Sequence, residues 1–116
     1  MTWYDKIIAV HRAVTDQVSH QARMQSTRYF VWQEEGTRDL KAGGRTAERV
    51  MVGTTDLYTK QEFDPWAEQL DEALDNAPDV LAWRRESIQY EEETGFTHIE
   101  WSWEVLVGWP AESKST

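Results

Sequence analysis

Residues 90–105, YEEETGFTHIEWSWEV, decide the fold of this chain. From His98 onward, apolar and polar side chains alternate. One face of the strand that continues to Val107 carries Ile99, Trp101, Trp103, Val105 and Val107, and the other carries His98, Glu100, Ser102 and Glu104. A period of two predicts a strand that is buried on one face. Burial of each apolar side chain stabilises a fold by roughly 1.5–3 kcal/mol, so folding alone accounts for the pattern.

The same stretch also has the composition of a metal or acid/base site. His98 and Glu100 share a face, and the nearest further candidates are Glu91, Glu92 and Glu93. A zinc site needs three or four convergent ligands, whereas glutamates of a turn are solvated. We therefore expect no catalytic residue, metal or cofactor. A small metal-dependent hydrolase that uses these residues is the least favoured alternative.

Two helices are predicted. Trp3, Ile7, Val10, Val14 and Val18 recur at helical spacing, which predicts a helix over residues 3–19. The segment FDPWAEQLDEALDNAP, residues 63–78, predicts a second helix, because Asp64 is a good N-cap and Pro65 suits the first helical position.

Two strands are predicted between the helices. In RYFVWQEEG, residues 28–36, apolar residues occupy both faces, which indicates an inner strand or one packed against a second subunit. ERVMVGTTDLYT, residues 48–59, predicts its partner, with Gly53 at a bulge or a close approach. The polar segment around Gly43 and Gly44 predicts a flexible loop over residues 36–47.

The order of these elements predicts an α+β fold with two layers. We expect an antiparallel sheet of about four strands with two helices packed on one face. At 116 residues the chain is expected to form a single domain, residues 1–116, with a disordered tail over residues 110–116.

Composition excludes several classes of protein. The chain contains no cysteine, which rules out disulfides and thiolate sites, and it has no apolar run long enough for a membrane span. Its net charge of −9 is uneven: residues 1–60 contain nine Lys and Arg against seven Asp and Glu, and residues 61–116 contain three against fourteen. An acidic chain is repelled by nucleic acid, so no specific nucleic-acid binding is expected.

Three phrases carry a resemblance to a known family. YFVWQEEG, VGTTDLYTKQEFDPWAEQLDEAL and THIEWSWEV resemble the tail-terminator and head-to-tail joining (tail completion) proteins of long-tailed bacteriophages. In that pattern a strand leads to a flexible loop, a second strand runs directly into a helix, and an aromatic-rich hairpin closes the domain. The resemblance covers residues 29–105.

The resemblance implies a non-enzymatic structural protein of the virion tail or neck, assembled in the host cytoplasm. It implies a ring-forming subunit, typically one of six, that caps the tail tube or joins tail to head. The implied partners are other copies of the chain, the tail tube protein and a head-completion or connector protein.

A ring contact between identical subunits needs two different complementary patches on each subunit. We hypothesise that a basic patch and an acidic patch form this contact. The basic patch comprises Arg38, Lys41, Arg45 and Arg49, and the acidic patch comprises Glu68, Asp71, Glu72 and Asp75. The alternatives are that these are ordinary solvated charges, or that the chain is an acidic protein-binding module such as a DNA-mimic inhibitor.

Overall fold

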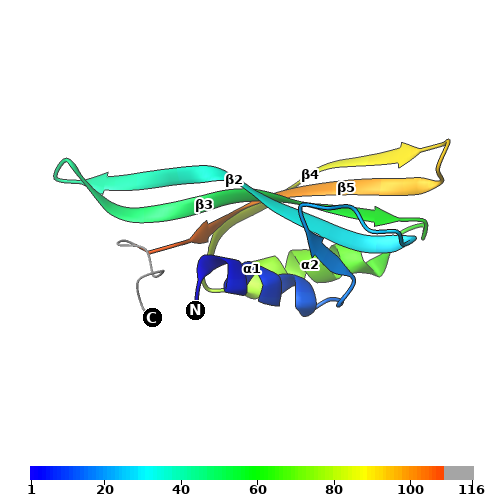
Figure 1. Ribbon diagram of the computed structural model, residues 1–116, viewed down its shortest axis with the longest axis horizontal. Coiled ribbons are helices and arrows are strands. Elements are labelled where there is room, and N and C mark those ends of the chain that lie inside the picture. Colours follow the sequence, from blue (N-terminus) through cyan, green and yellow to red (C-terminus); the bar gives the residue numbers. More distant parts are fainter. Residues whose placement is uncertain (109–116) are drawn as a thin grey trace.

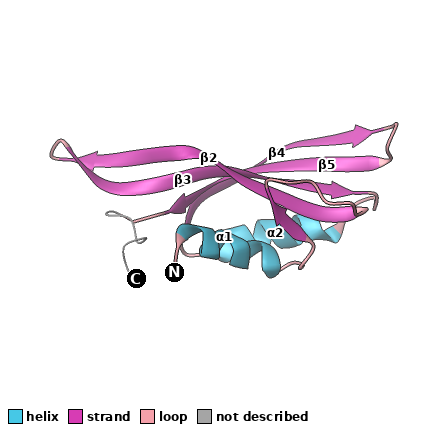
Figure 2. Cartoon of the chain, viewed as in Figure 1, coloured by secondary structure: helices cyan, strands magenta, loops and turns pink. Residues whose placement is uncertain are grey.

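The computed structural model describes residues 1–108; the tail predicted over residues 110–116 lies outside them. The elements are α1 (Trp3–Arg12), β1 (Val18–His20), β2 (Arg28–Ala42), β3 (Arg45–Thr59), α2 (Pro65–Asn76), β4 (Val80–Glu91) and β5 (Phe96–Leu106). They form one sheet with both helices on the same face, as Figures 1 and 2 show. The predicted α+β class is confirmed.

The sheet has five strands rather than the predicted four, in the order β1-β2-β3-β5-β4. The extra strand, β1, has three residues and pairs with β2 in parallel, while all other pairs are antiparallel. The prediction of an inner strand at residues 28–36 is confirmed, because β2 lies between β1 and β3. Its second apolar face is buried in a small cluster, where Tyr29 and Val31 pack with Tyr58.

The prediction of a helix over residues 3–19 is wrong at its C-terminal end. The helix begins at a capping box between Thr2 and Asp5 and ends at Arg12. Val14 and Val18 do pack against the main core, as their spacing indicated. They do so from a turn and from β1, because pairing with β2 draws residues 18–20 into the sheet.

The second helix begins where the sequence predicts. Asp64 caps α2 by accepting a hydrogen bond from the backbone nitrogen of Trp66 at 2.9 Å, and Pro65 follows. Its carboxylate is buried and also accepts from Arg28 Nε at 2.8 Å and Thr59 Oγ1 at 2.7 Å. Burial raises the pKa of Asp64, but these hydrogen bonds outweigh it, so the pKa lies below its usual value. This network ties the start of α2 to the ends of β2 and β3.

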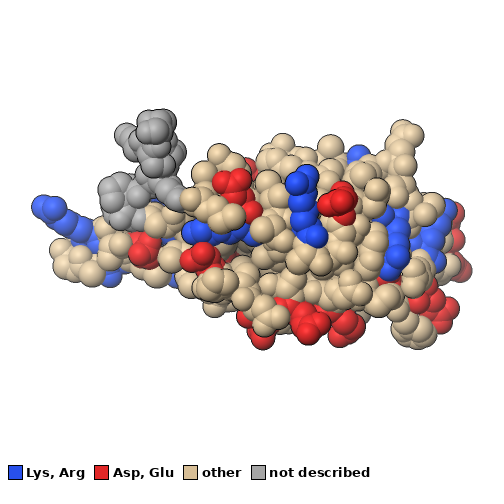
Figure 3. All heavy atoms as spheres, turned by 90° about the horizontal axis from the view of Figure 1, so that it is seen from below, with Lys and Arg blue, Asp and Glu red and all other residues tan. Residues whose placement is uncertain are grey.

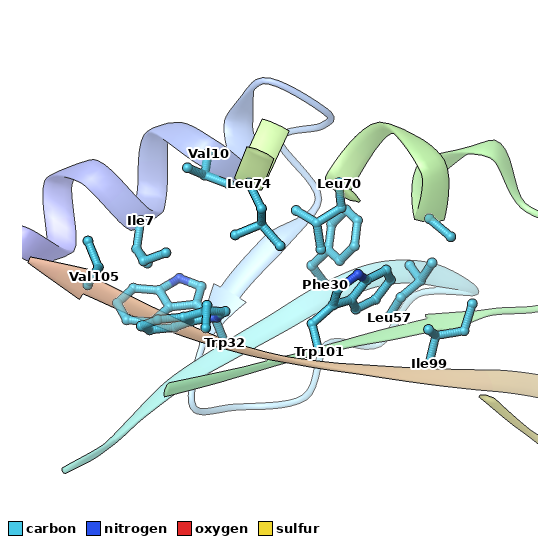
Figure 4. Packing of buried hydrophobic residues seen from close by; sticks show 12 residues of the cluster. Ile7, Val10, Phe30, Trp32, Leu57, Leu70, Leu74, Ile99, Trp101 and Val105 are labelled. Carbon is cyan, nitrogen blue, oxygen red and sulfur yellow. The ribbon is translucent and has the colours of Figure 1, made fainter. Parts of the chain in front are cut away.

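The main core lies between the helix layer and the sheet. Figure 4 shows side chains of both helices directed at the aromatic residues of the sheet. Trp101 and Trp103 are almost completely buried, which confirms the buried face predicted for this strand. The one histidine inside the core, His11, is also fully buried. A chain of hydrogen bonds runs from Trp103 Nε1 to Thr55 Oγ1 (2.9 Å) and from there to His11 Nε2 (2.8 Å).

The flexible loop predicted over residues 36–47 is instead an extension of two strands. β2 and β3 remain paired to a two-residue turn at Gly43 and Gly44, which have φ values of +60° and +77°. Two residues with positive φ are what a tight hairpin turn requires, and glycine supplies them without strain. We call residues 36–49 the arm. In Figure 1 the arm extends beyond the helix layer at one end of a molecule that measures 52 × 28 × 24 Å.

Candidate functional site

The four residues of the predicted basic patch all lie on the arm, but they have different environments. Arg49 pairs with Asp39 across the strands, with Nε 2.7 Å from Oδ1. Its hydrogen bond holds the pKa of the Asp39 carboxyl below the usual value. Arg38 pairs with Glu104 of β5. These two arginines therefore fasten the arm to itself and to the sheet.

Lys41 and Arg45 occupy the end of the arm. Both flank the turn and are exposed, and Leu40 beside them is 38% exposed. Figure 3 shows Lys and Arg atoms at this outer end of the molecule. The cationic surface that the arm presents to solvent is therefore smaller than the predicted patch, and it is concentrated at the tip.

The four residues of the predicted acidic patch lie on α2, and three of them bind neighbouring strands. Asp71 accepts a hydrogen bond from Trp101 Nε1 at 2.7 Å and pairs with Arg85 at 2.5 Å. Glu68 lies 3.3 Å from the same guanidinium. Asp75 accepts from Trp83 Nε1 at 3.1 Å. Part of this acidic charge therefore holds α2 onto β4 and β5.

The rest of the acidic patch faces outward. Glu72 is exposed, and together with Glu68, Asp71, Asp75 and Trp83 it lines a shallow depression of about 360 Å³. A depression lined by four carboxylates favours a cationic occupant. The structure thus brings the four predicted acidic residues together, at a distance along the chain from the basic arm.

The histidine that suggested a metal site has another partner. His98 Nε2 lies 2.7 Å from Asp56 Oδ1, and its ring stacks on Tyr58 with centroids 4.4 Å apart. Burial, together with the nearby Asp56 carboxylate, raises the pKa of Glu100. Within residues 1–108, no three His, Cys, Asp or Glu side chains are grouped so that they could hold a metal ion. The arrangement is that of a polar sheet face.

An apolar groove that the sequence did not indicate lies at the N-terminal end of α2. Its volume is about 560 Å³, and Phe63, Ala67, Ile88, Tyr90 and Ile99 contribute its apolar lining. Glu62, Glu68 and Arg85 contribute charged groups. We call it the Phe63 groove. Three of its lining side chains are unusually accessible for their type: Phe63 is 93% exposed, Tyr90 66% and Ile88 60%.

Phe63 also has a strained backbone. Its φ of +50° lies in the left-handed region, which costs a residue with a Cβ roughly 1–2 kcal/mol. Such outliers persist where the surrounding structure holds them, and here the buried Asp64 network follows immediately. Neither the exposed side chain of Phe63 nor its strained backbone stabilises the core.

Replacing Phe63 with glycine is expected to stabilise the isolated protein by about 1 kcal/mol, because glycine adopts positive φ freely. Chemical denaturation of both proteins measures the difference. Gln61→Gly is the matched control, because Gln61 lies in the same loop but has no positive φ. This variant should be less stable than the native protein. Equal losses in both variants would contradict the assignment of strain to Phe63.

Comparison with known proteins identifies the fold. No family model matches the chain, and no curated protein matches it. A chain in the solved structure of the virion of a native gene transfer agent (GTA) particle has a similar fold, with a TM-score of 0.57 over 92% of both chains. The two sequences are 13% identical, so the similarity is one of fold.

Among residues 1–108, no helix has the length and apolar character needed to cross a membrane.

Proposed function

We propose that this chain is a non-enzymatic structural subunit of a phage-like virion, which forms a ring at the end of the tail tube or joins tail to head. The observation that carries the proposal is the similarity in fold, over 92% of both chains, to a chain of a gene transfer agent virion. The resemblance of residues 29–105 to tail-terminator and head-to-tail joining proteins points to the same class. Its partners would be other copies of itself, the tail tube protein and a head-completion or connector protein.

The distribution of charge supports ring formation. A ring is built by a contact between two different surfaces of each subunit. The exposed cations at the arm tip and the carboxylates of α2 are two such surfaces, and they lie on different elements. Attraction between them would orient approaching subunits head to tail.

The mass of the protein in solution tests the proposal directly. Light scattering on a sizing column, over a wide concentration range, is expected to reveal a closed oligomer, with six subunits as the leading expectation. The same protein should add to the ends of purified tail tubes and stop their growth. A chain that stays monomeric at every concentration and leaves tube growth unchanged would overturn the proposal and favour an acidic binding module.

Reversing one charge at the arm tip tests the role of the basic patch. Arg45→Glu is expected to weaken self-association about tenfold or more, because it replaces attraction to α2 by repulsion. Arg12→Glu is the matched control, since Arg12 is also exposed but lies at the end of α1. Dissociation constants from sedimentation measure both. Equal effects would mean that net charge, and not the arm, governs association.

A further inference from the structure

We propose that the Phe63 groove receives the arm tip of a second copy of this chain. The inference rests on the proposed function, since it names the contact through which such subunits would associate. It goes beyond the pairing of opposite charges, because it assigns an apolar binding site and the segment that fills it.

Large apolar side chains are exposed together on one surface of the molecule. Phe63, Ile88 and Tyr90 come from the loop before α2 and from β4, and all three line the same groove. Exposed apolar side chains that gather around a concave surface mark binding sites more often than single exposed ones do. Aromatic anchors of this kind supply most of the free energy at protein interfaces.

The groove and the arm tip are chemically complementary. The groove combines apolar walls with the carboxylates of Glu62 and Glu68, while the cation that lines it among residues 1–108, Arg85, is already paired with Glu68 and Asp71. It therefore suits an occupant with an apolar side chain next to cations. The arm tip carries such side chains: Leu40 is partly exposed and precedes Lys41, and Arg45 lies opposite Ala42 at the turn, although Leu40 itself lies opposite Glu48.

The distance between the arm tip and the groove requires that a second copy of the chain supplies the tip. β3 runs from the arm tip to Thr59, and Thr59 itself lines the groove. Fifteen extended residues span roughly 45–50 Å, so the tip and the groove are separated by about the length of β3, which Figure 1 shows running along the long axis of the molecule. The arm cannot reach the groove of its own chain, and the contact must form between copies. Contacts of this head-to-tail kind build rings or filaments.

The groove is also continuous with the acidic patch. Glu68 lines both the Phe63 groove and the depression on α2. A hairpin that enters the groove would thus place its cations beside the carboxylates of α2. The apolar and the charged parts of the contact then belong to a single surface.

Cysteine cross-linking between two variants tests the contact. Because the chain has no native cysteine, only the introduced cysteines can form disulfides. Leu40→Cys is mixed with Ile88→Cys and oxidised, and disulfide-linked dimers are then measured on a non-reducing gel. The mixture is expected to yield several times more heterodimer than a mixture of Leu40→Cys with Leu81→Cys. Leu81 is a suitable control because it is 49% exposed on the same strand but does not line the groove. Equal yields from the two mixtures would overturn the proposal.

A second variant separates binding from stability. Phe63→Gly should weaken self-association about tenfold or more, although the isolated chain becomes more stable. Unchanged association would contradict the proposal. If the wild-type oligomer forms and neither test responds, the contact assigned here is wrong while the proposed function stands. If no oligomer or tube capping is found at all, the proposed function fails first.

Discussion

Replacing Gly53 with alanine is expected to destabilise the protein by about 3 kcal/mol or more. A Cβ at this position would lie 2.2 Å from Cη2 of Trp103 and 2.6 Å from the carbonyl oxygen of Gln33. Neither can yield easily: Trp103 is 1% exposed and its Nε1 is bonded to Thr55, while Gln33 belongs to the paired strand β2. Overpacking of this kind usually costs 1–3 kcal/mol, and a clash with backbone adds to it.

Thermal unfolding measures this effect, and Gly36→Ala is the matched control. Gly36 lies in β2, and a Cβ there would meet nothing within 4 Å. The control should stay within about 0.5 kcal/mol of the native protein. Comparable melting temperatures for the two alanine variants would show that the sheet accommodates a side chain at Gly53.

Lowering the pH from 7 to 4 is expected to remove about 3 kcal/mol of stability through His11 alone. Burial lowers the pKa of His11 from 6.5 to about 4. The unfolded chain therefore binds a proton at a higher pH than the folded chain does. The stability that neutral His11 contributes is fully present above pH 6.5. It is lost as the pH falls toward 4, at about 1.4 kcal/mol per pH unit.

Burial favours the neutral form of His11, and the hydrogen bond to the Ile7 carbonyl, which raises the pKa, offsets only part of this effect. The Ile7 carbonyl, 2.8 Å away, accepts the Nδ1 proton, so Nε2 accepts from the Thr55 hydroxyl. That hydroxyl in turn accepts from Trp103 Nε1. A proton on Nε2 would remove the acceptor of the Thr55 hydroxyl proton and place a charge in the buried site beside Phe30 and Trp32.

Denaturation at a series of pH values checks this expectation. His11→Gln should lose most of the slope between pH 6.5 and 4, whatever its stability at pH 7. His20→Gln is the control and should keep the slope, because His20 is exposed at the end of β1 and lies outside the core. The imidazole resonances of the native protein give an independent value. Titration of His11 near 6.5 would refute the assignment.

Several features of the fold were predictable because they arise from short-range regularities. The alternation in residues 99–107 identified β5, and Asp64 followed by Pro65 located the start of α2. Gly53 was predicted to mark a bulge or a close approach, and the contact with Trp103 confirms the close approach. For β5 and for the start of α2, the residues that determine the structure lie within a few positions of one another, whereas at Gly53 the sequence indicated a close approach but not its partner.

Other features depend on pairing between distant residues. β1 is too short to produce a periodic pattern and exists because its residues pair with β2. The arm is polar and reads as a loop, yet the pairing of Asp39 with Arg49 across the strands extends the hairpin to the two glycines. The two glycines were predicted to lie in a flexible loop, and the strand pairing is what makes them a two-residue turn.

The candidate site likewise combines features that short-range sequence patterns predict with features that depend on contacts between distant residues. The sequence by itself determined the class of fold, the buried face of β5, and the residues of a basic and an acidic group. Only the tertiary structure decided that Arg38 and Arg49 form ion pairs within the chain. It also decided that Asp71 accepts a hydrogen bond from the buried Trp101, and that the Phe63 side chain is exposed beside a groove. The physical reason is that periodicity and capping act over a few residues, whereas exposure and charge pairing depend on which distant segments fold against each other.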